Sequence, residues 1–134
     1  MGHLWPNNEQ WEFIRNYPDQ TAKVVMLNLL KFRPTADYSD HPDETPCSGE
    51  EAYQRYSALA SPCVESVGGR LVYSGKSEAP VIGPVDEKWD KVLLVEYPSI
   101  AAFQEMGFSD EYRSVAYHRT AALEDSRLIP IIGG

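Results

Sequence analysis

Residues 22–32, AKVVMLNLLKF, form an almost unbroken apolar run with Asn28 near its centre. A short run that is apolar at both odd and even positions is typical of a central strand covered on both faces. Asn is depleted in strands, and a buried amide without hydrogen-bond partners is destabilising. The pattern therefore predicts a strand and raises the question of what the Asn28 side chain binds.

Residues 48–69 show the clearest helical pattern. Ser48 and Glu51 form a capping box at its start, and Gly68 and Gly69 supply the stop. At about 100° per residue, the apolar positions fall on one stripe that should face the sheet. That stripe comprises Ala52, Tyr53, Tyr56, Leu59, Ala60, Cys63, Val64 and Val67.

The remaining elements follow from shorter patterns. Residues 7–18 predict a helix that Pro18 ends. Further strands are predicted at 70–77, 91–97 and 126–132, and further helices at 99–106 and 110–125. After the leading helix, the order strand, helix, strand, strand, helix, strand predicts an α+β, ferredoxin-like βαββαβ fold with a four-stranded antiparallel sheet.

We interpret residues 1–134 as one domain, with a helical extension at 1–20 and an acidic loop at 34–48. The predicted strands are apolar on both faces, but the helices suffice to cover only one. A second copy of the chain is the simplest cover for the other face, so we expect a homodimer.

Charge narrows the range of partners. The formal net charge of −8 disfavours nucleic acid and anionic membranes, which both need a basic surface. No apolar run is long enough for a membrane-spanning helix, and the first residues lack a signal-peptide pattern, so we expect a cytoplasmic protein. Cys47 and Cys63 are then expected to be two thiols.

The acidic loop has neither helical nor alternating periodicity. Three prolines occur in it, and no Lys or Arg occurs from Pro34 to Gln54. Loops of this length are often lids or inserts. We favour a solvated insertion over a lid and expect it to be the most mobile internal segment.

The helix predicted at 110–125 carries charge on its apolar side. Arg119 falls in the middle of the stripe that contains Tyr112, Ala116 and Leu123, while His118 lies at its edge. A core-facing arginine needs a partner. Two interpretations stay open: a structural ion pair, for example with Glu96, or a guanidinium that lines a pocket.

Several other polar side chains fall on the predicted sheet and its covering helices. We interpret them as the lining of one cavity in which Asn28 and Arg119 face a carboxylate or enolate. The predicted ligand-binding residues are Asn28, Arg119, Tyr53, Tyr56, Tyr73 and Glu96. The alternative is that each is satisfied separately, Asn28 by a neighbouring backbone group. We expect no metal and no cofactor, because the three histidines lack metal-ligand spacing and no dinucleotide fingerprint occurs.

Several segments together resemble the bacterial family called domain of unknown function 1330, within the dimeric α+β barrel superfamily. The segments are VVMLNLLKF, SGEEAYQRY, GGRLVYSG, WDKVLLVEYPS, FSDEYRSVAYHRTAALEDSRLI and PNNEQWEFI. The resemblance implies a ferredoxin-like monomer whose sheets pair face to face in a homodimer. Relatives in the superfamily include cofactor-independent monooxygenases, lactone isomerases and haem-binding enzymes. The family offers no catalytic residues to transfer.

Three functions remain open from the sequence. The first is a cofactor-independent enzyme acting on a small acidic or aromatic metabolite, with His118 or Tyr56 as proton carrier. The second is a small-molecule-binding protein that uses the same cavity without chemistry. The third is a purely structural homodimer whose polar residues satisfy one another.

Overall fold

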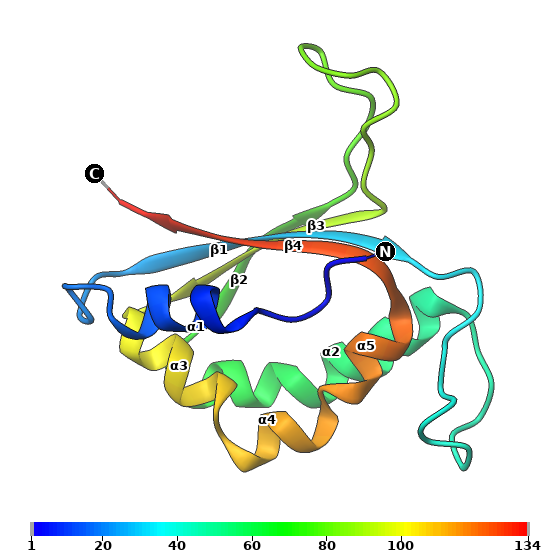
Figure 1. Cartoon of the computed structure of the whole chain (residues 1–134), viewed down its shortest axis with the longest axis horizontal. Coiled ribbons are helices and arrows are strands. Elements are labelled where there is room, and N and C mark those ends of the chain that lie inside the picture. The colour runs from blue at the N-terminus through cyan, green and yellow to red at the C-terminus, as the bar shows by residue number, and fades with distance from the viewer. Residues whose placement is uncertain (1, 134) are drawn as a thin grey trace.

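The computed structural model describes residues 2–133. Figure 1 shows a sheet with the helices gathered on one side of it. The elements in chain order are α1 (Asn8–Arg15), β1 (Val24–Phe32), α2 (Gly49–Ser66), β2 (Arg70–Gly75), β3 (Lys91–Tyr97), α3 (Ile100–Gly107), α4 (Asp110–Val115), α5 (Tyr117–Ala122) and β4 (Leu123–Ile132).

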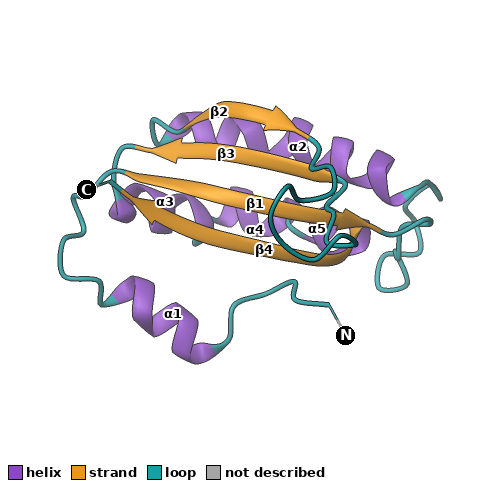
Figure 2. Cartoon of the chain, turned by 90° about the horizontal axis from the view of Figure 1, so that it is seen from above, coloured by secondary structure: helices purple, strands orange, loops and turns teal. Residues whose placement is uncertain are grey.

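The sheet has the strand order β2-β3-β1-β4, and every neighbouring pair is antiparallel. This order, with β1 and β3 at the centre, confirms the predicted ferredoxin-like fold. Figure 2 shows α1 lying beside β4, apart from the helices that cover the sheet. Among residues 2–133, no helix combines the length and apolar character needed to cross a membrane.

The predicted capping box forms at the start of α2. The Ser48 hydroxyl accepts from the Glu51 backbone N–H, and the Glu51 carboxylate accepts from the Ser48 N–H. At the other end, Gly68 has a φ of 84°, a conformation that glycine adopts without strain. These two local signals fix where the helix begins and ends.

The last predicted helix is shorter than its sequence pattern. It divides at Ala116 into α4 and α5, and it ends at Ala122 instead of continuing to residue 125. The reason is pairing, because Leu123 lies opposite Phe32 and begins the ladder between β4 and β1. Sheet hydrogen bonds override the helical propensity of these residues.

Strand register decides which face each polar residue occupies. Val24, Met26 and Leu30 are buried on the helix-covered face of β1. Asn28 has the same parity and lies opposite Leu93, which is also buried, so its side chain is on this face. The opposite side of the sheet, which we call the open face, carries an apolar row that no helix of residues 2–133 covers (Figure 1). The row comprises Val25, Leu27, Leu29, Tyr73, Val92, Leu94, Ile129 and Ile131.

The connection between β2 and β3 forms an arm at residues 76–90. Figures 1 and 2 show it rising on the side opposite the helices and lying over the open face. Val81, Ile82 and Val85 of the arm are almost completely exposed. Three apolar side chains in water on one projecting segment are typical of a surface that meets another molecule.

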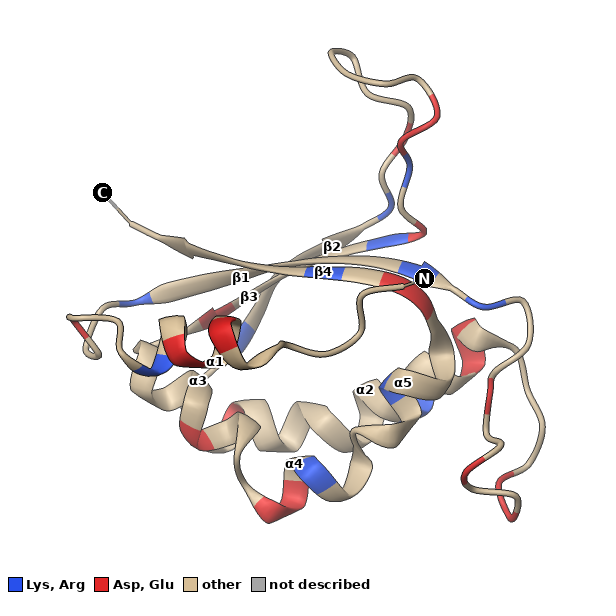
Figure 3. Cartoon of the chain, in the orientation of Figure 1, with Lys and Arg blue, Asp and Glu red and all other residues tan. Residues whose placement is uncertain are grey.

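The acidic loop packs against the helices. Figure 3 shows its acidic residues at the end of the molecule near α5 and the start of α2. The backbone N–H of Asp37 donates to the carbonyl of Ala121 at 2.8 Å, and Tyr38 is buried in the core. The interpretation as a solvated insertion is therefore wrong for Tyr38, because the helices offered an apolar site for its ring.

Candidate functional site

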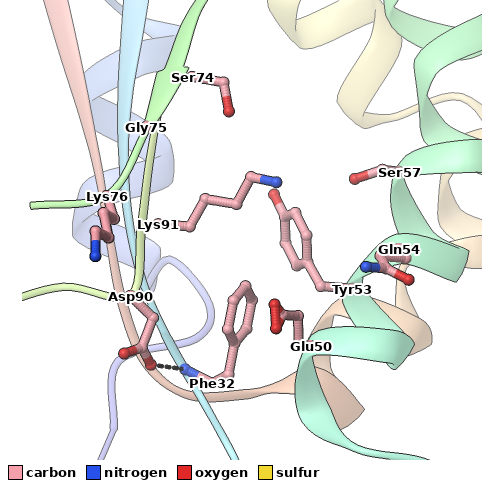
Figure 4. Close-up of a pocket in the computed structure, with 10 residues that line it drawn as sticks. All are labelled: Phe32, Glu50, Tyr53, Gln54, Ser57, Ser74, Gly75, Lys76, Asp90 and Lys91. Atoms are coloured by element: carbon pink, nitrogen blue, oxygen red, sulfur yellow. Dashed lines mark hydrogen bonds between the residues drawn. The ribbon is translucent and has the colours of Figure 1, made fainter.

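An open pocket of about 390 Å³ lies between the start of α2 and the adjoining ends of β1, β2 and β3 (Figure 4). A volume of this size suits a small organic molecule. The lining residues are Phe32, Glu50, Tyr53, Gln54, Ser57, Ser74, Gly75, Lys76, Asp90 and Lys91.

Local structure sends Lys91 and Tyr53 into this pocket. Lys91 begins β3 and pairs with Leu30, so it shares the helix-covered face of the sheet. Tyr53 belongs to the apolar stripe of α2 and faces the sheet from the other side. Figure 4 shows the two side chains extending toward the same space, with the hydroxyls of Ser57 and Ser74 at its rim.

Aromatic rings form one wall of the pocket. The centroids of Phe32 and Tyr53 lie 5.7 Å apart with the rings tilted by 50°. Asp90 does not point freely into the space, because its carboxylate accepts from the Phe32 N–H at 2.8 Å, as Figure 4 shows. This bond joins the end of β1 to the residue that precedes β3.

The hydroxyl of Tyr53 is neutral at physiological pH. Burial raises the pKa of Tyr53 to about 12, and the nearby Arg119 guanidinium opposes that rise only in part. A protonated hydroxyl and the Lys91 ammonium are both hydrogen-bond donors. Together they can hold an anionic oxygen, while the rings can contact a flat apolar group.

Arg119 lies in the layer between helices and sheet, as its position in the stripe predicted. It is 9% exposed, and its Nη1 donates to the carbonyl of Leu4 at 3.2 Å. The guanidinium is close enough to lower the pKa of Tyr53 and of Tyr56 against the larger effect of burial. The structure therefore brings Arg119, Tyr53 and Tyr56 together.

Two of the remaining predicted residues have partners within the protein. The Tyr56 and Tyr112 hydroxyls are hydrogen-bonded at 2.8 Å, and burial raises the pKa of Tyr56 well above its usual value. Such a hydroxyl holds its proton too tightly to act as a proton carrier near neutral pH. The Asn28 amide donates to the carbonyl of Met26 at 3.3 Å, which is the backbone partner that the alternative interpretation required.

Tyr73 and Glu96 lie on the open face, apart from the other predicted site residues. Glu96 is paired with Val25 in register and forms ion pairs with Lys23 at 3.6 Å and Arg70 at 3.5 Å. The sheet separates it from Arg119, so Glu96 is not the ion-pair partner that one of the two interpretations of Arg119 suggested. Tyr73 lies directly opposite Leu94 in the β2–β3 pair, so the two side chains share the open face, where Tyr73 is largely exposed.

His118 is more deeply buried than its place at the stripe edge indicated. It is 5% exposed, because the acidic loop lies over it. Its Nδ1 and the Tyr38 hydroxyl are hydrogen-bonded at 2.7 Å, and its Nε2 lies 3.8 Å from the Glu44 carboxylate. Burial lowers the pKa of His118, so the ring is neutral at pH 7. Residues 2–133 contain no group of three or more His, Cys, Asp or Glu that could hold a metal ion.

Comparison with known proteins agrees with this architecture. The family model described as "Domain of unknown function (DUF1330)" matches residues 45–132. The chain belongs to this family. Structures of the RPA0582 protein, of unknown function, from Rhodopseudomonas palustris are similar to this DUF1330 protein over nearly its whole length. One is 42% identical, with a TM-score of 0.89, and covers 100% of this chain and 98% of its own.

A second structure, of methylated RPA0582, is 43% identical, has a TM-score of 0.88, and covers 99% of this chain and 96% of its own. The hydroxynitrile lyase from Passiflora edulis is 10% identical, with a TM-score of 0.58, over 85% of this chain and 95% of its own. At that identity the likeness shows a shared fold alone. A comparison with curated proteins found no match.

Sequence reasoning missed the pocket lining of this DUF1330 protein apart from Tyr53. One signal was available for Lys91, because it shares the parity of Leu93, Val95 and Tyr97 in a predicted strand. A lysine at the end of a core-facing row can reach into the space between sheet and helix. Ser57 and Ser74 give no such signal, since serines occur throughout helices and strands without binding anything.

Proposed function

We propose that this DUF1330 protein binds a small molecule that carries a carboxylate or enolate on a flat apolar group. The observation that supports this is the convergence of Lys91 and Tyr53 in the open pocket beside the Phe32 ring. Lys91 forms no ion pair among residues 2–133, so its charge is available to a ligand. Arg119 supports the site from behind through Tyr53.

A cofactor-independent enzyme acting on the same ligand is the second candidate. It is favoured by Tyr53, whose hydroxyl stays protonated and shares the pocket with an ammonium group. A hydrogen-bond donor and a cation placed together stabilise the negative charge that develops when a proton leaves the carbon beside a carbonyl. In this reading Tyr53 and Lys91 bind the enolate oxygen, and the Glu50 carboxylate, which lines the same pocket, accepts the proton that leaves the carbon. Neither His118 nor Tyr56 is then the proton carrier.

Calorimetric titration with benzoate and salicylate tests the binding proposal. Both probes combine a carboxylate with an aromatic ring. Lys91→Met should weaken binding at least about tenfold, because Lys91 supplies a positive charge as well as a hydrogen bond to the carboxylate. Tyr53→Phe should weaken it less, because the hydroxyl supplies a hydrogen bond from a neutral donor. Lys88→Met, in the exposed arm, is the matched control and should leave the affinity unchanged.

Two results would contradict the binding proposal. If Lys91→Met binds either probe as tightly as wild type, the pocket is not the site. If neither probe nor any other aromatic acid binds the wild-type protein, the purely structural function gains support. Phenylacetate, which has α-protons, distinguishes an enzyme from a binding protein. An enzyme should catalyse exchange of these protons for deuterium in deuterated water, and a binding protein should not.

We also propose that the protein is a homodimer formed through the open face. The apolar row on that face is left without a helix, and the arm adds three exposed apolar side chains on the same side. A second copy presents the same row in return, as a two-fold interface requires. The arm of each copy then has an apolar surface within reach on its partner.

A further inference from the structure

The Glu44 carboxylate of the acidic loop sits among donors from two helices. One oxygen, Oε1, accepts from the Tyr117 hydroxyl at 2.6 Å and lies 3.8 Å from His118 Nε2. The other, Oε2, lies 3.7 Å from Arg55 Nη1. Arg55 comes from α2, whereas Tyr117 and His118 come from α5, so the donors converge from separate elements.

These donors are only partly satisfied by Glu44. Of the three contacts, only the one to Tyr117 is a hydrogen bond, because 3.7 and 3.8 Å exceed hydrogen-bond distance. Arg55 Nη1 is fully buried and has no hydrogen-bond partner within residues 2–133. A buried guanidinium nitrogen without a partner is unusual and destabilising. The site could therefore hold a carboxylate placed closer to Arg55 than Glu44 reaches.

We propose that Arg55, Tyr117 and His118 form a binding site for a free carboxylate, and that Glu44 of the chain's own loop occupies it in this structure. The site is separate from the pocket of Lys91 and does not depend on the proposed function. A carboxylate entering here displaces Glu44 and removes one of the bonds that hold the acidic loop.

The geometry explains why a free ligand can bind better than Glu44. The backbone N–H of Glu44 donates to the carbonyl of His41 at 3.0 Å, so the carboxylate is tied to a backbone that has a place of its own in the loop. A small free acid is not attached to the loop, so its carboxylate can take a position nearer to Arg55. It can accept from Arg55 and from the Nε2–H of neutral His118 together.

The same geometry gives the ligand access and shape. The Glu44 side chain is 27% exposed, so solvent reaches the carboxylate that must be displaced. The ring of Tyr117 stacks between those of His41 and His118, at centroid distances of 3.9 and 4.2 Å. The donors are flanked by these rings and contact a single carboxylate, so a small aliphatic acid such as acetate is the appropriate probe.

Titration with sodium acetate, against sodium chloride at equal ionic strength, tests the proposal. The readouts are the imidazole NMR signals of His118 and the thermal midpoint. Glu44→Ala opens the site and should bind acetate at least about tenfold more tightly than wild type, in which the tethered carboxylate competes. Asp43→Ala removes the neighbouring acid of the same loop and should behave as wild type.

The second variant guards against misfolding. Glu44→Gln retains the side-chain shape and the Tyr117 bond, and it should also bind acetate more tightly than wild type. Adding Arg55→Met to either variant should abolish the acetate response. If acetate moves the His118 signals of both Glu44 variants no more than chloride does, or if Arg55→Met leaves the response intact, Glu44 only anchors the loop and the proposal fails.

Discussion

Replacing Arg119 with Met tests whether this buried charge supports folding or serves the pocket. The guanidinium is 9% exposed and donates to the carbonyl of Leu4. It forms no ion pair among residues 2–133, and Glu96 lies across the sheet. Met fills a similar volume with an unbranched apolar chain, so the substitution removes the charge without leaving a large cavity.

Two opposing contributions determine the expected stability of this variant. Loss of a charged hydrogen bond to Leu4 costs about 1.5–3 kcal/mol. Removal of a desolvated charge gains a similar or larger amount, since isolated burial of an ion costs several kcal/mol. We therefore expect the free energy of unfolding to stay within about 1 kcal/mol of wild type, whereas breaking a true buried ion pair costs about 3–5 kcal/mol.

Equilibrium urea denaturation at pH 7 measures the difference. Arg113→Met, on the exposed side of α4, is the control for the general effect of losing one positive charge. A loss of about 3 kcal/mol or more for Arg119→Met alone would refute the reasoning, because it would reveal a buried anionic partner. Weaker binding of benzoate by a stable Arg119→Met protein would show that the guanidinium supports Tyr53 in the pocket.

Three further predictions concern His118, the open face and Tyr38. Burial holds the folded-state pKa of His118 below its ordinary value of 6.5, so the contribution of the neutral ring to stability is complete above pH 6.5 and is lost as the pH falls below that value. In urea denaturation from pH 7.5 to 5.5, the free energy of unfolding should therefore decline more steeply for wild type than for His118→Gln. Equal slopes would contradict this. Ile129→Lys should convert the dimer to a monomer in light scattering, whereas Leu128→Lys, next to it on the opposite face and equally exposed, should not; a monomeric wild type would exclude the proposed interface. Tyr38→Phe leaves His118 Nδ1 buried without its partner and should destabilise the fold by about 1–3 kcal/mol in the same denaturation assay, while an unchanged midpoint would show that water replaces the hydroxyl.

Much of the architecture follows from local patterns in the sequence. Hydrophobic periodicity and the Ser48 capping box predicted the strand and helix order, which allows few topologies besides the ferredoxin-like sheet. The same periodicity placed Arg119 and Tyr53 on the inner side of their helices. Such features are predictable because a backbone repeat of 3.6 or 2 residues determines which side chains share a face.

Faces and partners were decided only by the tertiary structure. The β1 strand is apolar at both odd and even positions, so its sequence could not show that Asn28 faces the helices. The pairing of β3 with β1 then places Glu96 on the opposite face of the sheet. His118 is buried by Tyr38, which lies 80 residues earlier in the chain. A periodic pattern indicates which positions are buried, but it does not indicate which distant segments come into contact. Contacts of that kind place Lys91 beside Tyr53 and Glu44 beside Arg55.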